Sequence, residues 1–71
     1  MEAATAITLN VNGDSMRVTV QTLAELVAEL GHGAATIATA VNGTFIPAAG
    51  RAIVALSDGD RVEIVSPRQG G

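Results

Sequence analysis

Apolar and polar residues alternate with a period of two in two segments near the start of the chain, Ile7–Val11 and residues 16–20. Such alternation is typical of strands that turn one face toward a core. Between them, Asn12-Gly13 favours the positive φ angles that a type I′ hairpin turn requires. The chain is therefore predicted to open with an antiparallel hairpin. The side chains expected to face inward are Ile7, Leu9, Val11, Met16, Val18 and Val20.

The next segment changes from strand spacing to helical spacing. Its apolar residues recur three and four positions apart, which predicts one buried stripe on an amphipathic helix. These residues are Leu23, Leu26, Val27 and Leu30. Thr22 and Glu25 form a capping box, in which the hydroxyl accepts from a free N–H and the carboxylate reaches back to the N–H of Thr22 itself. Gly31 can adopt the left-handed conformation that ends a helix.

Shorter patterns follow the helix. Residues 36–41 predict a strand whose inward residues are Ile37 and Val41, with alanines between them that would let the helix approach closely. Asn42-Gly43 marks a second turn. Thr44–Ile46 then predicts a short returning strand at a sheet edge, because proline follows it and cannot donate to a ladder.

A loop of little information is expected at residues 48–51, and buried anchors are expected at Ile53, Val54 and Leu56. The stretch Asp58-Gly59-Asp60 has two interpretations. Two carboxylates around a glycine can begin a calcium loop, but the other ligands of an EF-hand, including its terminal glutamate, are missing. A tight turn is therefore favoured.

Arg61–Val65 predicts the final strand, with Val62 and Ile64 inward and Arg61 and Glu63 outward. The order strand, strand, helix, strand, short strand, strand predicts an α+β fold, a mixed sheet of about four to five strands packed on one helix. Residues 1–66 are expected to form this domain, and residues 67–71 a flexible tail that ends in Gly-Gly. The α-carboxylate at the end of that tail is the candidate reactive group.

Composition removes several functional classes. The chain has 71 residues, a net charge of −3, no cysteine and no lysine. Its four arginines are scattered, so the basic surface that dominates nucleic-acid binding is absent. No signal peptide or apolar run long enough to span a membrane is seen. The single histidine, His32, lies between two glycines, shows no arrangement of base and orienting partner, and receives no role. A cytoplasmic protein that is not an enzyme is expected.

Three stretches together carry a resemblance to a known family. They are Val41-Asn42-Gly43-Thr44-Phe45-Ile46-Pro47, the strand region 58–65, and the ending Gln69-Gly70-Gly71. The chain resembles the ThiS family of sulfur carriers, which are ubiquitin-like β-grasp proteins of thiamine (thiazole) biosynthesis. The resemblance implies that the last strand lies between the first and the third.

The resemblance also implies a mechanism and partners. A ThiF-like enzyme would use ATP to adenylate Gly71, and a sulfur donor protein would then supply the sulfur of a thiocarboxylate. A ThiG-like thiazole synthase would accept that sulfur. Gly70, Gln69 and Arg68 would form the part of the tail that enters a partner's channel. The chain itself would bind no cofactor or metal and would act as a protein cosubstrate.

Three alternatives remain open from the sequence. Because of Pro67, near the diglycine, the chain also resembles the small subunit of molybdopterin synthase. That subunit is a sister carrier that uses the same chemistry. A non-covalent β-grasp interaction module with an idle tail is the second alternative. A modifier conjugated to lysines is a further possibility, although this chain has no lysine through which it could form chains on itself.

Overall fold

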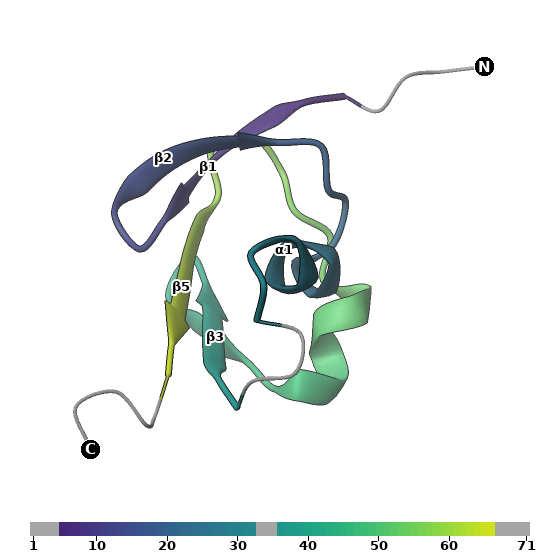
Figure 1. Ribbon diagram of the computed structural model, residues 1–71, viewed down its shortest axis with the longest axis vertical. Coiled ribbons are helices and arrows are strands. Elements are labelled where there is room, and N and C mark those ends of the chain that lie inside the picture. The colour runs from purple at the N-terminus through teal and green to yellow at the C-terminus, as the bar shows by residue number, and fades with distance from the viewer. Residues whose placement is uncertain (1–4, 33–35, 67–71) are drawn as a thin grey trace.

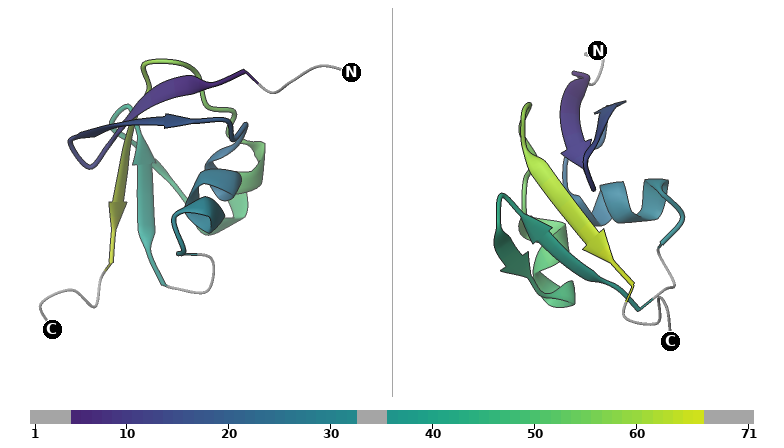
Figure 2. Two further views of the ribbon diagram at one scale, coloured as in Figure 1. Left: turned by 45° about the horizontal axis from the view of Figure 1, so that its top comes forward. Right: turned by 90° about the vertical axis from the view of Figure 1, so that its left-hand side faces the viewer.

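The computed structural model describes residues 5–32 and 36–66, which form a mixed sheet with two helices on one face (Figure 1 and Figure 2). The elements along the chain are β1 (Ile7–Val11), β2 (Asp14–Val18), α1 (Leu23–Glu29), β3 (Ala38–Val41), β4 (Thr44–Ile46), the 3-10 helix η1 (Ala48–Ile53) and β5 (Arg61–Val65). The sheet order is β2-β1-β5-β3-β4. The predicted α+β class and the central place of the last strand are confirmed.

The opening hairpin forms around Asn12 and Gly13, whose φ angles are 53° and 90°. Because this two-residue turn pairs Val11 directly with Asp14, β2 begins right after the glycine. The prediction of a strand at residues 16–20 was therefore displaced by two residues. Of the expected inward residues, Leu9 and Val11 are buried, and the other four are half-buried against the core.

Helix α1 begins and ends as its capping residues predict. The hydroxyl of Thr22 accepts from the N–H of Glu25 at 3.2 Å. The carboxylate of Glu25 accepts from the N–H of Gln21 at 2.7 Å, so the prediction that it reaches the N–H of Thr22 was wrong by one residue. At the other end Gly31 has φ 86°, and the N–H of His32 donates to the carbonyl of Val27 at 2.9 Å. This pairing closes a Schellman cap.

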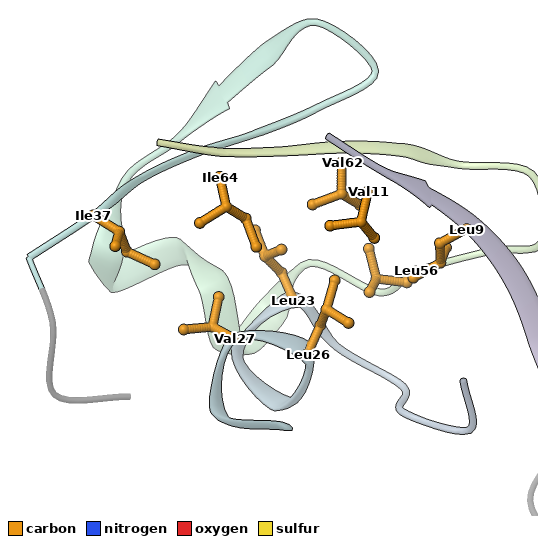
Figure 3. Close-up of a cluster of buried hydrophobic side chains, with 9 residues drawn as sticks. All are labelled: Leu9, Val11, Leu23, Leu26, Val27, Ile37, Leu56, Val62 and Ile64. Carbon is orange, nitrogen blue, oxygen red and sulfur yellow. The ribbon is translucent and has the colours of Figure 1, made fainter. Parts of the chain in front are cut away.

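The core lies between the sheet and α1, and the buried apolar side chains of the described residues are all aliphatic (Figure 3). Residues from β1 and β5 point toward Leu23, Leu26 and Val27 of the helix. Full burial of one leucine or valine side chain stabilises a fold by about 1.5–3 kcal/mol relative to exposure. The buried set is Leu9, Val11, Leu23, Leu26, Val27, Ile37, Leu56, Val62 and Ile64.

Residues 48–53 differ from the prediction. The expected loop is the 3-10 helix η1. Ile53 is 85% exposed, so its prediction as a buried anchor was wrong. Leu56 is buried and Val54 packs partly against the core, so the inward positions after η1 are taken by these two residues.

Hydrogen bonds from Arg51 connect η1 to β3 and to Ile37, the residue before that strand. Its Nε donates to the Thr39 hydroxyl at 3.1 Å, and its Nη2 donates to the carbonyl of Ile37 at 2.8 Å. Thr39 is 2% exposed, and its hydroxyl donates in turn to the carbonyl of Ile46 at 2.8 Å. The buried hydroxyl of Thr39 therefore has hydrogen-bond partners. A buried hydroxyl without a partner would reduce the stability of the fold.

Candidate functional site

The predicted reactive residues follow β5 directly. Gly71, and with it Gly70, Gln69 and Arg68, lies outside the described residues, which end at Ser66. What the structure describes is therefore the strand that leads to them. That strand determines where and in which direction the chain leaves the body.

β5 is paired on both of its sides. It runs parallel to β1, with Asn10 opposite Arg61 and Val11 opposite Val62. It runs antiparallel to β3 from Val62, opposite Val41, to Val65, opposite Ala38. Its inward residues, Val62 and Ile64, are buried as predicted, and Arg61 and Glu63 are exposed. The exit of the chain is thus set in the middle of the sheet.

The side chain of Asn12 extends the pairing of β1 with β5. β1 ends at Val11, one residue before the turn, and would leave the backbone of Ile64 without a neighbour on that side. The Oδ1 atom of Asn12 accepts from the N–H of Ile64 at 2.8 Å, and Nδ2 donates to its carbonyl at 3.1 Å. A side-chain amide thereby replaces one more residue of a parallel strand.

Asn42 has the corresponding role at the other end of β5. Its Oδ1 accepts from the N–H of Arg61 at 2.9 Å, and its backbone N–H donates to the Arg61 carbonyl at 2.7 Å. Its Nδ2 also donates to Asp60 Oδ1 at 3.0 Å. The asparagines of both Asn-Gly turns therefore make hydrogen bonds to the last strand. The sequence indicated only the turns, because the φ preference of asparagine is local and its side-chain partner is distant.

The stretch Asp58-Gly59-Asp60 is a tight turn, as favoured from the sequence. Oδ1 of Asp58 accepts from the N–H of Thr8 at 2.7 Å, and Oδ2 of Asp60 accepts from the N–H of Ser57 at 2.8 Å. The carboxylate of Asp60 thus closes the turn, and the carboxylate of Asp58 connects the turn to β1. Among residues 5–32 and 36–66, no three acidic or histidine side chains gather where they could hold a metal ion.

His32 lies at the end of α1, where its backbone takes part in the helix cap.

Within the described ranges, no helix has both the length and the apolar character that a membrane span would need.

The comparisons with known proteins agree with this arrangement. The model of the ThiS family matches residues 9–71. The crystal structure of a thiamine biosynthesis protein, ThiS, from Geobacter metallireducens superposes with a TM-score of 0.77 and 26% identity. The match covers 92% of this chain and 100% of that one. Among curated proteins, none matches this chain.

The fold and the strand order define a ubiquitin-like β-grasp protein. More narrowly, the chain belongs to the ThiS family, and the sulfur-carrier family indicated by the motifs is confirmed. The matched residues include both Asn-Gly turns and run through the final diglycine.

Proposed function

We propose that this protein carries sulfur for thiazole formation in thiamine biosynthesis, as a thiocarboxylate on the α-carboxyl group of Gly71. The observation that carries the proposal is the family match, which continues beyond the β-grasp body to Gly71. The relation to a solved ThiS supports the thiamine branch over the molybdopterin branch. Residues 67–71 act as the arm and residues 1–66 as the body that partners recognise, in the cytoplasm expected from the sequence.

The chemistry requires activation by a partner. A carboxylate is a poor acyl donor because the oxygen that must leave is strongly basic. A ThiF-like enzyme joins the Gly71 carboxylate to the α-phosphate of ATP and releases pyrophosphate. The outer sulfur of a persulfide on the donor protein then attacks the acyl carbon, and AMP leaves. A thiol attacks the donor's sulfur in the resulting acyl disulfide, which forms a disulfide with the donor and releases the thiocarboxylate. The carrier is a cosubstrate in these steps and binds no cofactor of its own.

The tail residues suit a narrow channel. Five residues from Pro67 to Gly71 span at most roughly 17 Å, at about 3.4 Å per residue. Glycine has no Cβ, so Gly70 and Gly71 allow close approach of the backbone and any φ that the enzyme imposes. Ordering such residues costs about 1–2 kcal/mol each. Contacts between the body and the enzyme are therefore needed to offset that cost.

Mass spectrometry tests the proposal. The purified protein is incubated with a ThiF-like enzyme, ATP and a sulfur donor, and its intact mass should rise by the exchange of one oxygen for sulfur. Fragmentation should place the change on Gly71. The matched control lacks Gly71 and should stay unmodified while it keeps the thermal stability of the full chain. An unchanged mass with an enzyme that modifies another carrier in the same assay would contradict the proposal.

A further inference from the structure

The last residues of β5 lie beside the turn of the first hairpin. β5 lies between β1 and β3 (Figure 1), and its parallel pairing with β1 reaches only as far as Val62, opposite Val11. The N–H of Asn12 donates to the carbonyl of Val62 at 2.9 Å, and the chain then turns at Gly13 into β2. Among the described residues, the bonds from the Asn12 side chain to Ile64 are the last that this hairpin makes to β5.

Both polar groups of the Ile64 backbone point toward the hairpin. The N–H donates to Oδ1 of Asn12 at 2.8 Å, and the carbonyl accepts from Nδ2 at 3.1 Å. Neighbouring residues of a strand direct these groups to opposite sides, so those of Glu63 and Val65 face β3. Because β1 ends at Val11, β1 could not supply partners for Ile64 if the Asn12 amide were absent.

Side-chain packing supports the end of β5 only weakly. Side chains alternate along a strand, and Thr39 points into the core, so Ala38 and Ala40 point away from α1. The prediction that these alanines let the helix approach closely was therefore wrong. Val65 lies opposite the small side chain of Ala38 and is 58% exposed. Hydrogen bonds therefore contribute more than packing to holding this end of the strand.

The identity of residue 12 satisfies two requirements at once. The turn needs a positive φ, here 53°, which asparagine and glycine both adopt. Ile64 needs one acceptor and one donor, and the asparagine amide supplies both from a short side chain. Glycine would serve the turn and leave Ile64 unpaired on this side.

The order of this strand end affects the proposed capture of Gly71. Each backbone residue that an enzyme must order when it binds a chain end reduces the affinity by about fivefold to thirtyfold. In the proposed function, residues 67–71 are ordered in this way. If Val65 and Ser66 also separated from the sheet, two more residues would have to be ordered before the carboxylate could react.

We propose that Asn12 is a positioning residue for the adenylation of Gly71. By holding the backbone of Ile64 beside the hairpin, it keeps Val65 and Ser66 in line with β5 and fixes the residue at which the arm begins. The activating enzyme then has fewer residues to order. Asn12 acts through β5 and touches no reacting atom. The inference rests on the proposed function, because it concerns the enzyme that activates Gly71.

Adenylation, measured as release of pyrophosphate at increasing carrier concentration, tests the role of Asn12. Asn12→Gly keeps the turn and removes the amide. The KM for this carrier should rise by about fivefold or more. Its kcat should stay within about twofold, because a change in KM alone reports lost binding and not a slower reaction of Gly71.

Asn42→Gly is the matched control. It removes an amide acceptor for the N–H of Arg61, at the other end of the same strand, and its KM should stay within about twofold. Both variants are assayed at a temperature at which circular dichroism shows them to be folded. An equal rise of KM in the two variants would overturn the inference, because the effect would then be a general loss of stability.

Heteronuclear NOE values of the backbone amides give a second measurement, without the enzyme. Asn12→Gly should lower the values at Val65 and Ser66, and Asn42→Gly should leave them unchanged. A rise in KM without any change at Val65 and Ser66 would mean that Asn12 contacts the enzyme directly, and would overturn the positioning role.

Two further outcomes separate this inference from the proposed function. Adenylation of the unaltered protein with the same KM for Asn12→Gly would overturn the role of Asn12 alone. No adenylation of the unaltered protein, by an enzyme that adenylates another carrier in the same assay, would overturn the proposed function and the role of Asn12 with it.

Discussion

The side-chain amide of Asn12 makes two hydrogen bonds to the backbone of Ile64, accepting from its N–H at 2.8 Å and donating to its carbonyl at 3.1 Å. The two residues are 52 positions apart. A turn residue near the start of the chain thus holds the strand that ends at the tail. Through this contact the first hairpin stabilises β5, the strand that precedes the proposed arm.

Asn12→Gly is expected to release that contact and keep the turn, because glycine adopts the φ of 53° readily. Unfolding free energy should fall by about 1–2 kcal/mol. Amide hydrogen exchange followed by NMR should accelerate at Ile64 and remain slow at Arg61.

The matched variant, Asn42→Gly, should give the reverse pattern. It keeps a positive φ in the second turn and removes the acceptor for the N–H of Arg61. Equal acceleration at Ile64 in both variants would mean that the effect is a general loss of stability and not a local one.

Leu26→Ala is expected to unfold a large fraction of the protein. Leu26 is fully buried between α1 and the sheet, and removal of such a side chain costs about 2–5 kcal/mol. A domain of this size has little stability in reserve. Urea denaturation measures the loss.

Ile53→Ala serves as the control for the core variant, since Ile53 is 85% exposed. Its unfolding free energy should stay within about 0.5 kcal/mol of the unaltered protein. A loss as large as that of Leu26→Ala would contradict the exposed position of Ile53.

Arg51→Met tests the connection between η1 and β3. Methionine keeps an apolar stem but loses the donors to the Thr39 hydroxyl and the Ile37 carbonyl. Unfolding free energy should fall by about 1–2 kcal/mol. Arg51→Lys should recover only part of it, because one ammonium cannot reproduce the planar fork. Arg17→Met, at an exposed position of β2, should have no measurable effect.

Gly70→Ala and Gly71→Ala test the narrow arm of the proposed function. Each adds a Cβ where the enzyme's channel is expected to fit closely, so kcat/KM for adenylation should fall by about tenfold or more. Unfolding free energy should not change, since the proposed function assigns both residues to the arm and not to the β-grasp body. Gln69→Ala is the milder control. Unaltered kcat/KM in both glycine variants would contradict a channel that requires glycine.

The elements that could be predicted from the sequence are those that interactions between residues close in sequence determine. The positive φ of Asn12-Gly13, the Thr22 cap and the Gly31 stop each act within a few residues, so the hairpin and α1 could be predicted without the fold. Alternation also placed Val62 and Ile64 inward, because neighbours on a strand must face opposite sides. The resemblance to ThiS supplied the central position of the last strand, which these patterns alone could not.

The tertiary structure decided which distant groups meet. Whether Asn12 reaches Ile64 depends on the insertion of β5 between β1 and β3, which no local pattern encodes. The hydrophobicity of Ile53 and Phe45 favours burial of both side chains, but it does not determine whether the fold places them in the core. The register of β3 with β4 and β5 set two alanines between Phe45 and Val65. That register, and not the composition of the strands, places Phe45 and Val65 on the exposed face of the sheet.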